Sequence, residues 1–299
     1  MSQVDAAPAI YSPIGPPSLR RLVAIAAPMI LSQASETVMR FVDRLFLSYL
    51  GKLHIAAAMS GGLSAFVFSS LFAGIVGYTN AIVAQYYGSG QRYKCVQTVT
   101  QGLYLTALFL PLLILLIPVV HGTFHLAGHS PEQISLEFSY FRILMVGSIF
   151  LLLRQVLVGY FLGIGRTRVV MLANLVGLIV NVPLNYVLIF GHLGMPALGI
   201  EGAAIGTVAA SATIFLVLLQ QYLRHEFVRR YRGEGAFRLN TPLLRRLLRF
   251  GFPAGAELFL NVFAFNAFIQ IIHSMGEDVA AAVTITFNYD MVAFIPMIG

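Results

Sequence analysis

The sequence predicts an all-α integral membrane protein, organised as a parallel repeat of six-helix bundles with about eight spans in this chain. Charged residues make up only 10% of the chain and hydrophobic residues 58%, whereas an ordinary soluble domain is about 25% charged. Long apolar stretches recur along the chain, and the pattern at its start returns near its end. A soluble protein of this composition would expose apolar surface and aggregate, which favours a lipid environment.

Eight apolar stretches are each long enough to cross the ~30 Å hydrocarbon core of a bilayer, which takes about 20 helical residues. The second and fourth stretches are longer than this, so we expect them to extend beyond the lipid. In chain order the predicted spans are 22–50, 54–87, 96–120, 132–161, 169–190, 201–222, 250–273 and 279–299.

The basic residues are distributed as in a membrane protein whose N-terminus is cytoplasmic. They concentrate in the N-terminal arm and in the segments after the second, fourth and sixth spans, and eight arginines lie between residues 224 and 249. The other connections are nearly free of Lys and Arg. Because positively charged segments stay on the cytoplasmic side, the even-numbered loops are predicted to face the cytoplasm. The net charge of +7 therefore indicates membrane orientation and no nucleic-acid partner.

An internal repeat with an offset of 225 residues predicts the domain organisation. The shift places residues 17–22 on residues 242–247, and Pro28 on Pro253, without a gap. An even number of spans separates the two copies, so both run in the same direction, as in parallel-repeat transporters. We expect a parent of roughly 450 residues and twelve spans. The predicted parts are an N-terminal arm (1–21), a first lobe (22–223), a cytoplasmic linker (224–249) and an incomplete second lobe (250–299).

Several segments resemble the multidrug and toxic compound extrusion (MATE) exporters of the MOP flippase superfamily. They are Ala-Pro-Met-Ile at 27–30, Phe-Val-Asp-Arg at 41–44, the glycine-bearing turn at 84–90, Gly-Phe-Pro-Ala-Gly at 251–255 and the stretch 294–299. The resemblance covers nearly the whole chain in order and spacing. It implies two lobes around a central cavity, with helices that bend at Pro28 and Pro253.

The same resemblance implies a function. MATE exporters expel cationic or amphiphilic compounds in exchange for sodium ions or protons, so we expect a monomeric antiporter in a bacterial inner membrane. No GxxxxGK phosphate loop and no Ser-His-Asp pattern is present, which disfavours ATP binding and hydrolysis. We expect a transporter, not an enzyme, with no cofactor beyond the coupling ion.

Ionisable residues inside the first span are candidate functional groups, because burying them in a membrane is costly. Glu36 and Asp43 are seven residues apart and share a helix face, while Arg40 lies four residues after Glu36 and can pair with it. Asp43 suits a proton carrier if burial dominates, or a sodium ligand if a nearby Arg dominates. The alternative is an ion pair of Asp43 with Arg40 or Arg44 that only fixes helix packing.

The fifth span adds Asn181 and Asn185, which lie four residues apart on one helix face around Pro183. Asn oxygens, and the backbone carbonyl that Pro183 frees, are hard ligands that suit sodium. The resemblance implies a cation site made of Asp43, Asn181, Asn185 and Thr207. Some relatives have Asp at the position of Asn185, so this site carries less negative charge. The alternative for both asparagines is hydrogen bonding between helices.

Polar residues also occur elsewhere in the fifth span and in the predicted second lobe. Asn174, also in the fifth span, is assigned to helix packing. In the second lobe Glu257, Asn261 and Asp290 are candidates to line a cavity; the resemblance points to position 261 for a cation-binding Glu, and Glu257 lies one turn earlier.

Metal chemistry other than sodium binding is not predicted. The single Cys95 excludes a cysteine-based metal site and an internal disulfide framework. Histidines recur every four residues at 121, 125 and 129, but glycines at 122 and 128 favour a polar loop over a metal-binding helix.

Two alternative functions stay open at this point. A flippase for lipid-linked oligosaccharides would share the two-lobe plan and need a cationic cavity, for which Arg40, Arg44, Arg142 and Arg154 are candidates. Arginines that face the central cavity would favour the flippase, and arginines that lie against acids and the cytoplasmic edge would favour the exporter. The second alternative is a receptor or scaffold with several spans.

Overall fold

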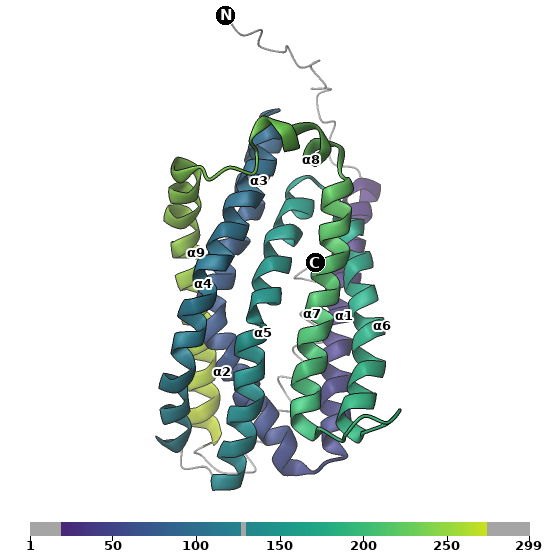
Figure 1. Cartoon of the computed structure of the whole chain (residues 1–299), viewed down its shortest axis with the longest axis vertical. Helices are drawn as coiled ribbons and strands as arrows, with labels where there is room; N and C mark the ends of the chain where they lie inside the picture. The colour runs from purple at the N-terminus through teal and green to yellow at the C-terminus, as the bar shows by residue number, and fades with distance from the viewer. Residues whose placement is uncertain (1–18, 127–129, 274–299) are drawn as a thin grey trace, which may run out of the picture.

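The computed structural model describes residues 19–126 and 130–273, and this part of the chain is helical with short connections (Figure 1). The predicted eighth span (279–299), with Asp290, lies outside the described residues, as does His129. The elements are α1 (Leu19–Ser48), α2 (Lys52–Gly77), α3 (Thr79–Gly88), α4 (Arg92–Leu126), α5 (Pro131–Gly163), α6 (Thr167–Phe190), α7 (Gly199–Arg224), α8 (Glu226–Tyr231), a 3-10 turn (Arg232–Glu234) and α9 (Thr241–His273).

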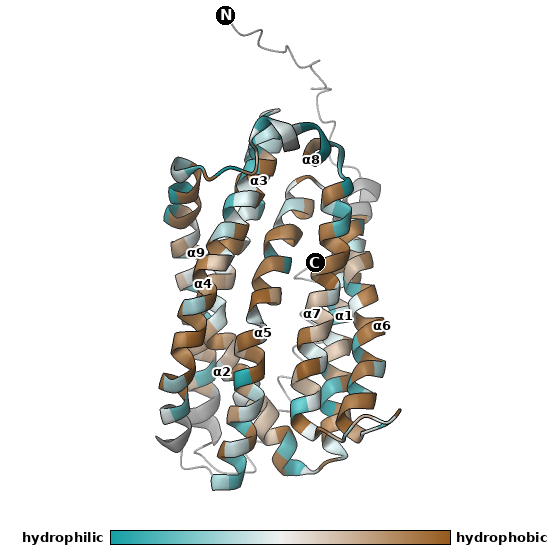
Figure 2. Ribbon diagram, in the orientation of Figure 1, coloured by the Kyte–Doolittle hydropathy of each residue, from teal (hydrophilic) through white to brown (hydrophobic). Residues whose placement is uncertain are grey.

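The predicted all-α membrane fold is confirmed. Within the described residues, six helical segments are long and apolar enough to cross a membrane, and α2 with α3 counts as one of them. The long helices run side by side, with apolar residues along their length and polar residues gathered at the ends (Figure 2). Helix α1 is not among the six, but it has 30 residues and packs lengthwise on α6. We therefore treat α1 as a seventh span whose second half is charged.

The predicted second span is divided in two at Tyr78. The backbone N–H of Tyr78 bonds to the carbonyls of Gly74 and Ile75 at 3.2 and 3.3 Å, and α3 starts at the next residue. The division leaves α3 as a ten-residue extension that packs on α4 and α5.

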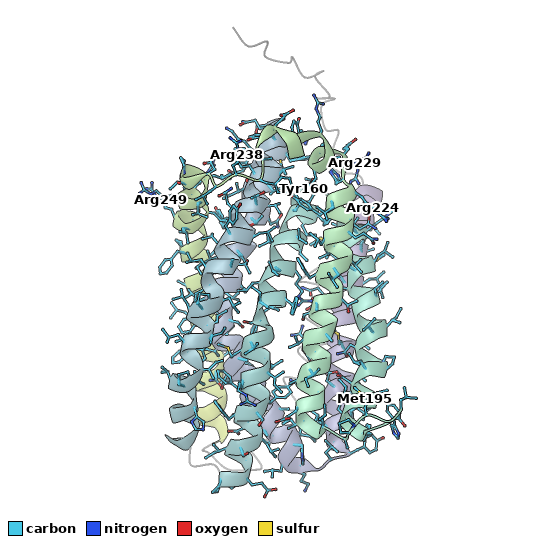
Figure 3. The ribbon with its side chains drawn as sticks, in the orientation of Figure 1. Tyr160, Met195, Arg224, Arg229, Arg238 and Arg249 are labelled. Atoms are coloured by element: carbon cyan, nitrogen blue, oxygen red, sulfur yellow. The ribbon has the colours of Figure 1, made fainter. Side chains whose placement is uncertain are left out.

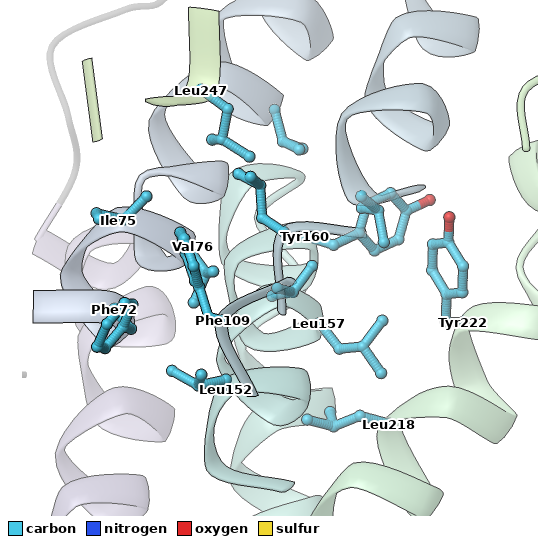
Figure 4. Close-up of a cluster of buried hydrophobic side chains, with 14 of the residues drawn as sticks. Phe72, Ile75, Val76, Phe109, Leu152, Leu157, Tyr160, Leu218, Tyr222 and Leu247 are labelled. Carbon is cyan, nitrogen blue, oxygen red and sulfur yellow. The ribbon is translucent and has the colours of Figure 1, made fainter. Parts of the chain in front are cut away.

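The main core lies where α2, α4, α5, α7 and α9 meet. Its apolar side chains include Phe72, Phe109, Leu157, Leu218 and Leu247 (Figure 4). A smaller apolar cluster joins α1, α2, α5, α6 and α7 near the far end of α1. The two clusters hold the first six spans together as one bundle, and α9 is added to its side against α2.

The contact between α2 and α9 depends on glycine. A Cβ atom built on Gly74 would lie 2.5 Å from the Cα of Gly255, and one built on Gly251 would lie 2.6 Å from the carbonyl oxygen of Ile75. Side chains at these positions would push the helices apart, so the glycines allow close backbone packing. Helix α9, which is predicted to be the first helix of a second lobe, is thereby fixed to α2.

The predicted linker 224–249 contains more helix than expected. It holds α8, the 3-10 turn and the first nine residues of α9, which starts at Thr241. The Asn240 side chain caps α9 by accepting the N–H of Leu243 at 3.0 Å. Gln101 of α4 binds the backbone of Arg238 and Asn240 at 3.0 Å each. The predicted linker is therefore attached to α4 just before α9 begins.

The prediction of a loop around the three histidines is wrong for residues 121–126, which the structure describes as helix. Helix α4 continues to Leu126, so His121 and His125 are helical, and the ring of His121 lies 4.2 Å from that of Phe138. Gly122 costs helix stability but does not end the helix. No cluster of three metal-binding side chains occurs among the described residues. Pro28 and Pro253 lie inside α1 and α9, and the bends expected there stay a prediction.

Candidate cation site

Asp43 is a buried carboxylate at the meeting point of three helices. Only 8% of the residue is exposed. The amide Nδ2 of Asn185 on α6 donates to its Oδ1, and the hydroxyl of Thr207 on α7 lies 3.3 Å from its Oδ2. The structure thus brings together three of the four residues predicted for a cation site, through direct contacts.

The close approach of α6 and α7 depends on small residues of α7. A Cβ atom on Gly206 would collide with Oδ1 of Asn185, so the Asn185 side chain occupies the space that this glycine leaves. One turn earlier, a Cβ on Gly202 would lie 2.6 Å from the carbonyl oxygen of Leu188. These two glycines let α7 approach α6 closely enough for Thr207 to reach Asp43.

Several oxygen atoms at this site have unused capacity to bind a ligand. The Thr207 hydroxyl can donate its one proton to Asp43, at 3.3 Å, or to the carbonyl of Ala203, at 3.0 Å, and its lone pairs stay available to a cation. Oδ1 of Asn185 and both polar atoms of Asn181 have no hydrogen-bond partner among the described residues, and both asparagines are fully buried. An unpaired buried polar group costs about 1–3 kcal/mol. Carboxylate, amide and hydroxyl oxygens are the ligands of hard cations.

The carbonyl freed by Pro183 does not join this set. Pro183 and Ile179, whose carbonyl loses its helical partner, both lie on the exposed face of α6. The asparagines lie on the buried face, so the side chains supply the ligands on α6.

Tyr140 of α5 is a member of the site that the sequence did not reveal. The residue is 8% exposed, and its hydroxyl lies near Thr207 and the Asp43 carboxylate. A single Tyr within an apolar span carries no signal of this proximity. Glu137, one turn earlier on α5, was also missed; it is fully buried and accepts the side-chain amide of Gln133 at 2.8 Å.

Glu36 belongs to a separate polar cluster nearer the N-terminal end of α1. Its carboxylate lies 3.5 Å from Arg154 of α5 and 3.5 Å from Arg40 of its own helix. The amide of Asn174 on α6 lies 3.5 Å from Glu36 and 2.5 Å from the hydroxyl of Ser32. Asn174 thus makes the interhelical hydrogen bonds expected of it. Glu36 has no direct contact with Asp43, although it was predicted to share that site.

A comparison with family models decides the family. The model described as MatE matches residues 28–187, more than half of the chain, and this range includes Asp43, Asn181 and Asn185. The chain belongs to the MatE family. Members of the family are transporters and not enzymes, which disfavours the receptor or scaffold alternative.

Solved structures show the same fold as this MatE chain. A MOP superfamily transporter from Pyrococcus furiosus superimposes with a TM-score of 0.79 at 22% identity, covering 92% of this chain and 60% of the other. A multidrug resistance MATE family transporter in an outward-facing conformation gives 0.77 at 22% identity, covering 92% and 61%. A multidrug resistance MATE family transporter in an inward-facing conformation gives 0.73 at 20% identity, covering 92% and 62%. The chain thus spans about three fifths of the length of these relatives.

The four arginines that kept the flippase alternative open differ in their surroundings in the described part of the MatE chain. Arg40 and Arg154 lie against Glu36. Arg44 and Arg142 are exposed. Two of the four are therefore paired with an acid, which is the arrangement expected of an exporter.

The second-lobe candidates are not joined to the Asp43 site. Glu257 and Asn261 are exposed on α9, which packs on α2 and α4 and makes no described contact with Asp43. Their role in a cavity stays a prediction.

Proposed function

We propose that this MatE chain provides the first lobe, and the start of the second, of a secondary antiporter. The protein would export cationic or amphiphilic small molecules in exchange for sodium ions or protons. The observation that carries the proposal is the buried Asp43 carboxylate between Asn185 and Thr207, where the Asn185 amide oxygen has no hydrogen-bond partner among the described residues. Because the chain spans about three fifths of its solved relatives, transport is proposed for the full-length protein.

The chemistry of the site suits a monovalent cation or a proton. Asp43 supplies one negative charge, while Asn181, Asn185 and Thr207 are neutral. A divalent cation would keep an uncompensated charge in a buried site, which is costly. Rotation of the Asn185 amide by half a turn would exchange its Nδ2 donor for the Oδ1 acceptor beside Asp43. The residue can therefore bind either the empty carboxylate or a cation held by that carboxylate.

Coupling follows from the difference between the charged and the neutralised site. An ionised carboxylate inside the membrane bundle is costly unless it is paired or hydrated. Binding of a sodium ion or proton to Asp43 removes this cost and favours close packing of α1 on α6 and α7. Release has the opposite effect, and a ligand that binds one packing better shifts the equilibrium toward it.

The proposed orientation places the N-terminus in the cytoplasm. Arg224, Arg229, Arg238 and Arg249 lie at the end of the bundle where α8 lies, and Met195 lies at the opposite end (Figure 3). The positive-inside rule supports a cytoplasmic location for this arginine-rich end. We propose a bacterial inner membrane, a monomer, and contact with lipid but not with nucleic acid.

Vesicles that contain the full-length protein provide the test. Efflux of a fluorescent organic cation is measured under a sodium gradient alone and under a pH gradient alone. We expect one gradient to drive transport, and Asp43→Asn to reduce the rate at least about tenfold, equal to about 1.4 kcal/mol. Glu132→Gln, the same chemical change at an exposed position, is the matched control. Full export by Asp43→Asn would refute the coupling role of Asp43.

A further inference from the structure

The interface between α1 and α6 carries a line of polar residues that extends well beyond the Asp43 site. We call it the polar seam: Ser32, Glu36 and Asp43 on α1, and Asn174, Asn181 and Asn185 on α6. At one end of the seam Asp43 contacts Asn185. At the other end Asn174 contacts both Ser32 and Glu36. At 1.5 Å per residue, the α1 part runs about 17 Å from Asp43 toward the N-terminal end.

Some polar atoms of the polar seam have no hydrogen-bond partner in the described part of the protein. Asn174 is 5% exposed and Asn181 and Asn185 are fully buried, yet each has at least one side-chain atom without a hydrogen-bond partner in the described chain. Asn181 has two, and it lies between the two ends of the seam. Polar side chains between membrane helices usually hydrogen-bond to the facing helix. Buried polar atoms left open along a line indicate a route for water or a small cation.

Toward the outer end of α1, the site is closed by apolar packing. One turn beyond Asp43, Asn185 and Thr207 lie Leu47 on α1, Ile189 on α6 and Ala203 on α7, respectively. These three residues belong to one buried cluster and are at most 1% exposed. The open polar atoms therefore continue from Asp43 only toward the N-terminal end of α1.

At that end the seam meets a charged pair between helices that are not packed neighbours. Helix α1 packs mainly on α6, whereas α5 packs on α2, α4 and α7. Arg154 reaches from α5 to Glu36, and only 13% of its side chain is exposed. The separation of 3.5 Å is longer than the 2.7–2.9 Å of a tight charge-assisted bond, and Nε of Arg154 has no described partner. Such a pair can open without breaking a tight bond.

We propose that Glu36 and Arg154 form a gate on the cytoplasmic side of the polar seam. When the pair is closed, it separates the Asp43 site from the cytoplasm. When the pair parts, the seam connects the two and the coupling ion can pass along Asn181. The inference rests on the proposed orientation and antiport function. Glu36 and Arg154 are positioning residues in this scheme, because neither touches the ion held at Asp43.

The gate can be tested by thiol labelling, independently of transport. Cys95 is the only cysteine of these 299 residues and is buried. Cys95→Ser, together with Ser at any cysteine in the rest of the full-length protein, gives a background without thiols. Leu178→Cys then places a reporter on the seam, one turn after Asn174 and three residues before Asn181. A membrane-impermeant methanethiosulfonate reagent is added to the cytoplasmic side of vesicles that contain the full-length protein. Leu172→Cys, on the exposed face of α6, controls for general changes in labelling.

Removing both charges should open the gate. We expect Glu36→Gln with Arg154→Gln to speed cytoplasmic labelling at position 178 roughly tenfold, a change equal to about 1.4 kcal/mol. Labelling from the outer side should not change. Arg40→Gln is the matched control, because Arg40 also pairs with Glu36 but is exposed and on the same helix. It should leave the labelling rate as it is.

Three results would overturn the gate: an unchanged rate in the double variant, the same acceleration in Arg40→Gln, or equal acceleration from both sides. The last result would mean that the pair is only a structural support of the lobe. Should the double variant fail to fold, Arg154→Lys keeps the charge but loses the guanidinium, and we expect a smaller, one-sided acceleration; its absence would also count against the gate. Export retained by Asp43→Asn would refute the coupling proposal and leave the labelling result standing.

Discussion

The hydroxyl of Thr207 lies 3.3 Å from a carboxylate oxygen of Asp43, although the two residues are 164 positions apart in the chain. The same hydroxyl lies 3.0 Å from the carbonyl of Ala203 on its own helix. An oxygen whose proton is used by its own helix can offer a lone pair to a cation. The hydroxyl has a single proton and can donate it either to Asp43 or to Ala203, and in the second arrangement its lone pairs are available to a cation held by Asp43.

Replacement of Thr207 should weaken coupling-ion binding in a way that depends on the hydroxyl. Val has nearly the shape of Thr but lacks the hydroxyl, so Thr207→Val removes one ligand of the ion. We expect this variant to raise the ion concentration for half-maximal export about tenfold, which corresponds to about 1.4 kcal/mol. Thr207→Ser keeps the oxygen and should stay within about threefold of the parent. Equal effects of the two variants would show that the methyl group, and not the hydroxyl, is what matters.

A methyl group at position 206 should displace the Asn185 side chain and so disrupt the site. Gly206→Ala places its Cβ in the space that the Asn185 side chain occupies. We expect a loss of about 1–3 kcal/mol of stability, as for other overpacked positions, together with a loss of export. Thermal unfolding followed in detergent measures the first effect. Gly233→Ala, where no atom lies within 4 Å of the new Cβ, is the control and should change little.

Asn181 should show a conflict between stability and function. Both of its side-chain polar atoms are buried without a described partner, so Asn181→Leu removes a desolvation cost of about 1–3 kcal/mol. We predict a higher unfolding temperature and a lower export rate in the same variant. Asn174→Leu provides the contrast, because it breaks bonds to Ser32 and Glu36 and should lower the unfolding temperature. A destabilised Asn181→Leu protein would contradict the assignment of Asn181 as an open ligand.

His225, between α7 and α8, should make stability depend on pH. The N–H of Phe227 and the hydroxyl of Tyr160 lie 3.4 and 3.0 Å from its Nδ1, and a backbone N–H can only donate, so Nδ1 is unprotonated. Burial, aided by the positive charge of Arg166 and opposed by Glu226, lowers the pKa of His225 below its ordinary value. As the pH falls, His225 is therefore protonated at a higher pH in the unfolded chain than in the folded protein.

Because the folded pKa of His225 is the lower one, stability should fall as the pH drops below about 6.5, the ordinary value for histidine. It should level off once the pH is below the folded pKa. We expect the unfolding temperature to decrease between about pH 7.5 and pH 5.5. His225→Asn keeps an acceptor at the start of α8 but does not titrate, so its decrease should be smaller. An identical decrease in the variant would place the pH dependence elsewhere.

Much of the fold could be predicted from the sequence, because its signals are long and repeated. Apolar runs of about 20 residues predict spans regardless of their neighbours, since lipid accepts an apolar helix on every side. The predicted ends of the fourth, fifth and sixth spans lie within two residues of α5, α6 and α7. The least accurate boundaries are at the polar ends, where α4 continues past Gly122 and α9 starts inside the predicted linker. Hydropathy does not report helices that extend beyond the membrane.

By itself the sequence determined the class of the protein and the chemical type of its polar residues. Composition, long apolar runs and the motifs around Pro28 and Asp43 were sufficient to predict membership of the MatE family. Only the tertiary structure decided which polar residues meet. Spacing along a helix showed Glu36 and Asp43 on one face, but it did not show that Arg154 of α5 reaches the first and that Tyr140 lies beside the second. These contacts depend on how α1, α5, α6 and α7 are arranged around one another, and that arrangement is a property of several helix surfaces together.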